Sequence, residues 1–268
     1  MLCLNPSIKG RFLSGLLLLC CFSTAQAHEL SLLIGEERWL YREYSASNQE
    51  LNREQGWLSG FETSLLWDIN QQHKIYLFYA FQDDPLEYDG ASQSLSGGVT
   101  SPHQTITDEV NYKNIATWRY YFDNVYFGFG GQYQAWDREI RAAGDVLKLD
   151  EYYRWFGPVL ELGWIKQYQR FRFELTSSAA SLNGDMVVDL THAGLNKPKL
   201  YLRKGYEIGA VLKLSYQLSE QWALQVKHNQ GYRYFPRTDP VIVSSRSLVE
   251  PKSKNYFQGY WAGLNYQF

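Results

Sequence analysis

The chain has 268 residues, of which 45% are hydrophobic and 16% aromatic, yet its mean hydropathy is only −0.40. It contains no uncharged apolar stretch of roughly 18 residues or more, which excludes a bundle of membrane-spanning helices. The formal net charge of −2 gives no basic character of the kind that indicates nucleic-acid binding. What remains is an aromatic-rich, amphipathic chain that we expect to be all-β.

Residues 1–27 have the pattern of a secretory signal peptide. Lys9 and Arg11 are its only charged residues, and the apolar run 12–22 is too short to span a bilayer as an uncleaved anchor. Ala25-Gln26-Ala27 then form a small-residue cleavage site, which predicts a mature chain of residues 28–268. The cysteines all lie in the removed segment: Cys3, Cys20 and Cys21. The mature chain would therefore have neither disulfides nor thiol chemistry.

From about residue 35 onward, apolar side chains alternate with polar or small ones, and this period of two predicts strands rather than helices. The first strand, about 35–45, is the least regular, with Trp39 and Tyr41 against Arg38 and Arg42. The alternation then recurs at 57–67, 74–82, 112–122, 125–134, 160–164, 170–176, 206–218, 222–229 and 260–268. We therefore predict ten strands, with eight or twelve as alternatives.

The connections between these strands alternate in length. Short ones fall near 70–72, 123–124, 166–169 and 219–221, and long ones near 46–55, 84–109, 139–149, 184–201 and 235–252. Aromatic residues next to the short turns would form a girdle at the periplasmic interface: Trp67, Phe122, Trp164 and Trp222. Because a strand in hydrocarbon cannot leave backbone groups unpaired, this pattern predicts a closed, antiparallel, up-and-down transmembrane β-barrel in the bacterial outer membrane, reached through the periplasm.

Apolar side chains that face lipid leave the opposite face of each strand pointing inward. The charged residues of that face form the expected lumen network: Glu62, Lys113, Arg119, Glu161, Arg172, Glu174, Glu207, Lys213, Lys227 and Arg233. Ten strands enclose a narrow interior, and an unpaired buried charge is costly, so we expect these charges to pair across a filled lumen. The alternative is a small polar pore with a charge-selective ring.

The end of the chain resembles the C-terminal signature of bacterial outer-membrane barrels. Leu264, Tyr266 and Phe268 alternate on one face of the last predicted strand, and Phe268 is the final residue. The resemblance implies that the barrel assembly machinery recognises this strand.

Two groups of residues in the sequence are candidates for a hydrolytic site. Asp83 and Asp84 end one strand, and Asp189 with His192 ends another, in a layout that resembles the rim site of the omptin proteases, where such groups would activate a water. The omptin sequence motifs are absent around these residues. A lipid A deacylase would need a serine near a lipid-facing histidine, but the next residue on the face of His228 is Gln230. No spacing of ligands suggests a metal site, and no cofactor is expected.

Several short strings resemble an uncharacterised group of proteobacterial outer-membrane β-barrel proteins. They are 39–43 (WLYRE), 56–60 (GWLSG), 87–90 (EYDG), 128–131 (GFGG) with 136–138 (WDR), 151–155 (EYYRW) and 265–268 (NYQF). The resemblance implies fold and location, but no established activity. We therefore expect a monomeric, non-enzymatic barrel with a structural, adhesive or narrow-pore role, in contact with outer-membrane lipid and lipopolysaccharide and not with nucleic acid. The alternatives are the omptin-like hydrolase and a soluble, lipocalin-like binding barrel.

Overall fold

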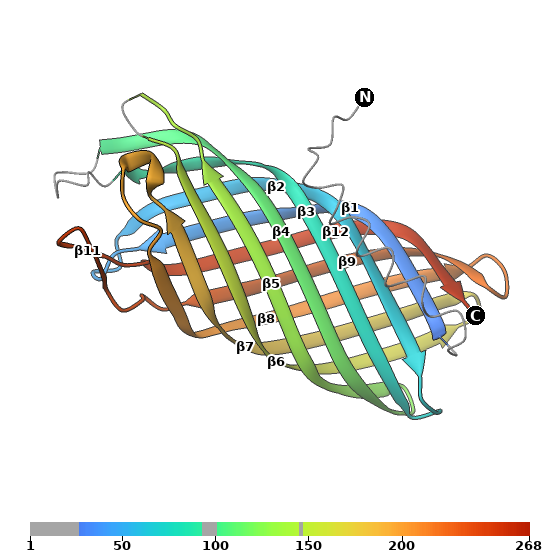
Figure 1. The fold of residues 1–268 in the computed structure, drawn as a ribbon. Coiled ribbons are helices and arrows are strands. Elements are labelled where there is room, and N and C mark those ends of the chain that lie inside the picture. The colour runs from blue at the N-terminus through green and yellow to red at the C-terminus, as the bar shows by residue number, and fades with distance from the viewer. Residues whose placement is uncertain (1–26, 93–100, 145–146) are drawn as a thin grey trace.

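The structure is a computed structural model that describes residues 27–92, 101–144 and 147–268. Nearly all of the expected signal peptide lies outside these residues, so its cleavage stays a prediction. The described chain forms a closed barrel of ten antiparallel strands, as predicted, and Figure 1 shows them running obliquely around the barrel axis. The strands are β1 (Ala27–Tyr44), β2 (Glu50–Asp68), β3 (His73–Ser92), β4 (Ser101–Phe122), β5 (Val125–Ile140), β6 (Leu149–Tyr168), β7 (Phe171–Asp189), β8 (Lys199–Gln217), β9 (Trp222–Phe235) and β12 (Lys252–Gln267).

Each barrel strand pairs with the strands before and after it in the sequence, and β1 pairs with β12 to close the sheet. Leu32 lies opposite Leu264 in this closing pair. The connection between β9 and β12 carries a separate hairpin of β10 (Val241–Val243) and β11 (Arg246–Leu248). A single 3-10 turn, η1 (Thr191–Ala193), follows β7. No helix in the described part of the chain is long and apolar enough to cross a membrane.

The strands are longer than the sequence pattern suggested. The alternation was expected over 112–122 and 222–229, whereas β4 has 22 residues and β9 has 14. Much of the predicted connection 84–109 belongs to β3 and β4, β2 already begins at Glu50, and β7 continues to Asp189. The alternation persists in these extensions, but the apolar residues move to the inside. Leu86 and Tyr88, for example, are buried in the interior, so the simple expectation of apolar residues outside fails there.

The first strand illustrates this reversal. Near the short-turn end, Leu32 and Ile34 point outward and are 57% and 69% exposed. Farther along the same strand, Trp39 is fully buried, Tyr41 is nearly so, and Arg38 is exposed. Trp39 and Tyr41 therefore face the interior, contrary to the expected apolar exterior. Outside the bilayer a strand exposes its polar side to water and buries its apolar side.

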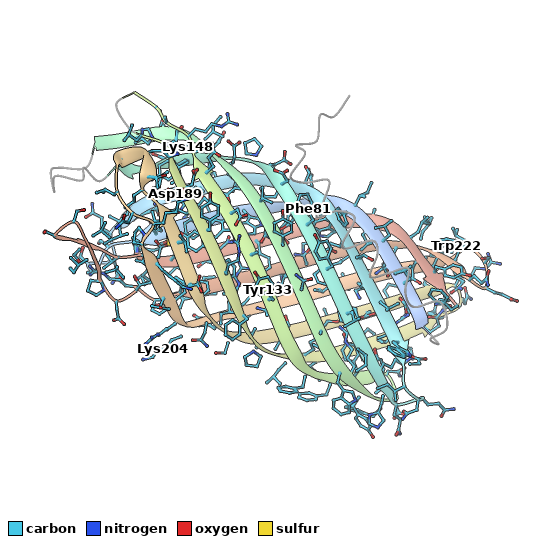
Figure 2. The ribbon with its side chains drawn as sticks, in the orientation of Figure 1. Phe81, Tyr133, Lys148, Asp189, Lys204 and Trp222 are labelled. Atoms are coloured by element: carbon cyan, nitrogen blue, oxygen red, sulfur yellow. The ribbon has the colours of Figure 1, made fainter. Side chains whose placement is uncertain are left out.

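The outer surface divides into two zones along the barrel axis. Toward the short turns, the outward side chains are exposed and apolar, including Phe127, Leu162, Leu212, Leu224 and Leu264. Toward the long connections, the outward positions become acidic or basic, as at Asp83, Asp108, Asp137 and Asp185. The apolar zone is the lipid-facing belt of an outer-membrane barrel, and the charged zone projects beyond it. Trp222 marks the short-turn end in Figure 2, whereas Lys148 and Asp189 lie near the opposite end.

Candidate functional site

The middle of the barrel is crossed by ion pairs between strands that are not neighbours. Glu207 on β8 accepts a hydrogen bond from Lys113 on β4 at 2.6 Å and another from Arg233 on β9 at 2.7 Å. Lys227 on β9 contacts Glu62 on β2. Glu62, Glu207 and Lys227 are at most 8% exposed, so these pairs are shielded from solvent.

A second group of ion pairs lies closer to the short turns. Arg119 bonds to Glu161 at 2.8 Å, and its other arm is 3.9 Å from Glu174. Glu174 also contacts Lys213 at 3.3 Å and Arg172 at 3.5 Å. The ten charges expected inside the barrel are thus all placed inside, and each has a partner of opposite sign. Sequence reasoning missed Glu29, which accepts a hydrogen bond from Arg172 at 2.6 Å, because we began the first strand too late.

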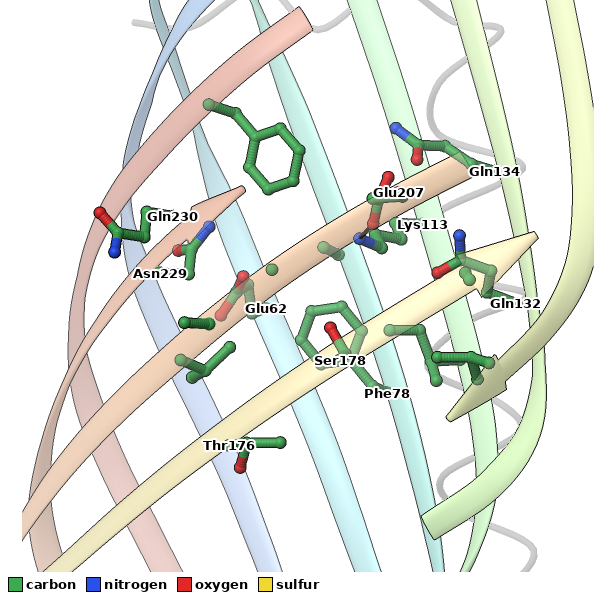
Figure 3. Close-up of a pocket in the computed structure, with 18 of the residues that line it drawn as sticks. Glu62, Phe78, Lys113, Gln132, Gln134, Thr176, Ser178, Glu207, Asn229 and Gln230 are labelled. Carbon is green, nitrogen blue, oxygen red and sulfur yellow. Dashed lines mark hydrogen bonds and ion pairs between the residues drawn. The ribbon is translucent and has the colours of Figure 1, made fainter. Parts of the chain in front are cut away.

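A cavity of about 100 Å³ lies among these pairs. Figure 3 shows Glu62, Lys113, Gln132, Glu207 and Asn229 around it, contributed by five different strands. Its lining mixes these polar groups with apolar side chains, and its volume suits several water molecules. It is smaller than the roughly 300 Å³ at which drug-sized ligand pockets begin, so it suits water or a small polar solute.

On the short-turn side of the cavity, Arg119 narrows the barrel interior. Its guanidinium lies 3.6 Å from the centre of the Tyr76 ring and 4.5 Å from that of Tyr126, an arrangement that adds cation–π attraction. The hydroxyl of Tyr126 is 2.6 Å from that of Thr176. Rings, guanidinium and ion pairs together occupy the interior at this level.

On the long-connection side of the cavity, a buried cluster of aromatic and aliphatic side chains fills the barrel interior. Trp136 is central: its ring lies 5.7 Å from Trp39, 4.6 Å from Tyr153 and 6.3 Å from Trp155. Other members include Leu58, Leu86, Leu182, Met186, Leu200, Leu202 and Phe235. We refer to this cluster as the aromatic plug. The aromatic plug was not predicted from the sequence, because we expected apolar side chains to face the lipid.

Buried carboxylates surround Arg138 on the extracellular side of the plug. Its guanidinium contacts Glu54, Glu151 and, at 3.4 Å, Glu43. A hydrogen bond from Tyr153 at 3.0 Å links Glu250, in the connection between β11 and β12, to this group. Arg138 and the carboxylates around it were not predicted from the sequence. Extending the period of two along each strand would have placed Glu54 on the inward face of Glu62, and Arg138 on that of Gln134.

Of the four rim residues considered for hydrolysis, Asp83 and Asp84 lie on β3, Asp189 ends β7, and His192 lies in η1. Asp83 shares the outward face of Phe81, and Asp84 accepts a hydrogen bond from the backbone N–H of Ser59 at 2.8 Å. Asp189 is paired with Lys197 at 2.6 Å. The Nε2 atom of His192 is 3.7 Å from Asp150. Each of these contacts joins a rim residue either to the connection that follows its own strand or to the neighbouring strand.

Asp83 and Asp84 are on β3, and Asp189 and His192 are at the end of β7 and in the turn that follows it. No hydrogen bond or ion pair among the described residues joins the two pairs. Hydrogen bonds from Lys197 and Thr191 hold the pKa of Asp189 below its usual range, so Asp189 is ionised near neutral pH and is a weaker base than an ordinary aspartate.

His228, the histidine considered for a lipid A deacylase, lies on the outer surface of the barrel. The Nδ1 atom of His228 is 3.1 Å from the carbonyl oxygen of Gly259, and its ring lies 4.9 Å from that of Tyr260 on the outer surface. Within the described residues, no group of three or more histidine, cysteine or acidic side chains is arranged to hold a metal ion.

Comparisons with known proteins support the fold. No family model matches the chain, and no curated protein matches it significantly. Among solved structures, the outer membrane protease OmpT from Escherichia coli matches with a TM-score of 0.63 and 11% identity, over 91% of this chain and 98% of that one. The β domain of the Bordetella autotransporter BrkA matches at 0.43 and 12% identity, over 91% and 100% of the chains. OprG from Pseudomonas aeruginosa matches at 0.38 and 10%, over 91% and 97%. This chain is an outer-membrane β-barrel.

Proposed function

We propose that the protein is a closed, non-conducting and non-enzymatic barrel with a structural role, whose extracellular end is its adhesive surface. The observation that carries the proposal is the occupied interior. Ion pairs cross the barrel from Arg119 to Glu174 and from Lys113 to Glu207, and the aromatic plug lies beyond both on the long-connection side. A cavity of about 100 Å³ lies between these ion pairs and packed rings, which supports a closed barrel rather than an open pore.

The extension of the barrel beyond the lipid-facing belt supports the adhesive part of the proposal. Strands of up to 22 residues exceed the 9 to 11 or so that a tilted strand needs to cross the hydrocarbon. The extension lifts the β10–β11 hairpin and η1 away from the lipid surface (Figure 1). Connections held on a rigid sheet in this way are the usual carriers of binding residues.

Planar-bilayer recording of the refolded protein tests closure. We expect no steady conductance from the wild type, and channel openings from a Trp155→Ala/Trp136→Ala variant that removes much of the aromatic plug. The matched control is Trp222→Ala, which removes an exposed tryptophan from the outer surface. Steady ohmic conductance from the wild type would overturn the proposal and favour the narrow pore.

An omptin-like hydrolase is the second candidate, and the fold shared with OmpT favours it. Its weakness is that no hydrogen bond or ion pair among the described residues joins Asp83 and Asp84 to Asp189 and His192. Incubation of refolded protein with a mixed fluorogenic peptide library, in the presence of lipopolysaccharide, tests it. Cleavage that is lost in both Asp84→Asn and Asp189→Asn, but retained in the exposed control Asp239→Asn, would establish the hydrolase and overturn the non-enzymatic proposal.

A further inference from the structure

Outward-facing cations gather on one side of the barrel, just beyond the lipid-facing belt. They lie on the neighbouring strands β8, β12 and β1, with β9 between β8 and β12. We refer to them as the cationic belt: Arg38, Arg42, Arg203, Lys204, Lys252 and Lys254. Figure 2 shows Lys204 projecting from this side, across the barrel from Lys148.

The belt is continuous across the seam where the barrel closes. Arg42 on β1 lies opposite Lys254 on β12, and Tyr44 lies opposite Lys252. The ammonium groups of Lys252 and Lys254 are 5.2 Å and 4.9 Å from the centre of the Tyr44 ring. Tyr44 thus holds both lysines side by side on the outer surface.

Most of the belt has no counter-charge. Arg42 is paired with Glu50 at 3.7 Å, but the other five cations have no ion pair among the described residues. Excess positive charge with no internal partner is available for an external anion.

Outward-facing tyrosines lie between the belt and the lipid-facing leucines. Tyr206, Tyr232, Tyr234 and Tyr256 form a connected row, with ring centres 5.9 Å (Tyr206–Tyr232), 5.3 Å (Tyr206–Tyr234) and 4.8 Å (Tyr232–Tyr256) apart. Along β12 the outward side chains change from Leu264 to Tyr256 and then to Lys254. This order of apolar, tyrosine and cation is the one expected where hydrocarbon gives way to headgroups.

The opposite side of the barrel has the reverse character. Its outward positions at a comparable height carry Asp83, Asp108 and Asp137. Its arginines are neutralised: Arg141 bonds to Asp108 at 2.6 Å, and Arg154 contacts Asp137. At this height, the described cations without an ion pair therefore lie on one side of the barrel.

We propose that the cationic belt and the tyrosine row bind the phosphorylated headgroup of lipopolysaccharide in the outer leaflet. The belt meets the bilayer at the long-connection end of the barrel, where that leaflet lies in an outer-membrane protein. Phosphates at the lipid A headgroup are the anions at this height, and Arg and Lys supply charge-assisted hydrogen bonds to them. The tyrosines pack against the glucosamine backbone while the leucines below contact the acyl chains.

A triple variant, Arg38→Gln/Arg203→Gln/Lys254→Gln, tests the site by removing three unpaired cations from three strands. The probe is bisphosphorylated lipid A in detergent micelles, titrated against refolded protein whose folding is checked by heat-modifiable migration. Each lost cation should weaken binding about fivefold, or roughly a hundredfold for the triple variant. The matched control, Arg141→Gln/Lys148→Gln/Arg154→Gln, removes three cations from the acidic side and should bind like the wild type.

Two further probes identify the ligand. Lipid A without phosphates should bind the wild type as weakly as the triple variant binds the phosphorylated form. Phosphatidylglycerol vesicles, whose headgroup carries one negative charge, should lose less binding in the triple variant than bisphosphorylated lipid A does. If the triple variant fails to fold, Arg38→Gln alone, at an exposed residue without an ion pair, should still lose about fivefold. Equal lipid A binding by the triple variant and the wild type, an equal loss in the control, or an equal loss toward phosphatidylglycerol would each overturn the proposal.

Discussion

Lys113 and Glu207 meet at 2.6 Å in the middle of the barrel although they belong to β4 and β8, which are separated by three other strands. Their bond spans the interior and does not run along the wall. Arg233 contacts the same carboxylate from β9, so a single glutamate ties three strands together. Such a contact fixes the cross-section of the barrel as well as neutralising charge.

Replacement of that glutamate should be costly. Glu207→Gln leaves Lys113 and Arg233 buried without a counter-charge, and we expect a loss of about 3–5 kcal/mol in the free energy of unfolding in urea. The control is Asp185→Asn, which breaks the exposed pair with Lys199 and should cost less than about 1 kcal/mol. Equal losses in the two variants would mean that the interior pair is hydrated as freely as the surface one.

Leu212 and Lys213 are adjacent on β8 but face different media, so their substitutions should destabilise the barrel for different reasons. Leu212 is outward and exposed, and Leu212→Arg should destabilise the barrel by about 2–4 kcal/mol near the middle of the bilayer. As a control, Ile242→Arg, in the exposed β10–β11 hairpin, should leave the urea midpoint unchanged. A harmless Leu212→Arg would contradict the assignment of this zone to lipid.

The inward neighbour, Lys213, contacts Glu174 at 3.3 Å. Lys213→Leu should lower stability without opening a conducting path, because Tyr76, Arg119 and the aromatic plug still fill the interior. Urea unfolding and bilayer conductance of the same preparation measure both effects. A gain of cation-selective conductance with unchanged stability would point instead to a wet pore.

Glu250 gives the docking of the connection 236–251 a predicted pH dependence. Burial raises the pKa of Glu250 well above its usual range, and the carboxylates of Glu43 and Glu151 raise it further, against the opposing effects of Arg138 and Tyr153. A raised pKa in the folded state means that docking is strongest below the pKa of the unfolded chain and weakens as pH rises through the folded value.

Tryptic cleavage after the exposed Arg237 measures this effect. The ratio of wild-type to Glu250→Gln cleavage rates should increase with pH, because glutamine stays neutral at every pH. The pH dependence of trypsin itself affects both proteins equally and cancels in the ratio. A ratio that stays constant between pH 5 and pH 8 or so would show that Glu250 does not titrate with docking in this range.

Deletion of Phe268 should reduce the amount of protein in the outer membrane sharply. Phe268 is exposed and stacks edge-on against Tyr266 at 4.9 Å, which leaves it on the outer surface at the short-turn end of the barrel. Quantitative immunoblotting of outer-membrane fractions measures the effect, with Phe268→Tyr as the conservative control. Wild-type levels of the deletion variant would contradict an assembly role for Leu264, Tyr266 and Phe268.

The amino-acid sequence by itself determined the ten strands, the closure of the sheet and the inward face near the short turns. The reason is physical: a strand in hydrocarbon must pair its whole backbone, and alternation assigns each side chain to lipid or interior without reference to any other strand. Leu212 and Lys213 could therefore be assigned to opposite faces from their neighbours alone.

Only the tertiary structure decided which interior charges meet, where the lipid-facing belt ends and what fills the barrel above it. The contact of Lys113 with Glu207 depends on the tilt and stagger of all the strands between them, which local periodicity does not encode. Trp39 and Tyr41 look like lipid-facing residues in the sequence, because an apolar side chain is equally suited to hydrocarbon and to a packed core. Their burial followed once the strands extended beyond the membrane, where water covers the outside and the only apolar environment left is the interior.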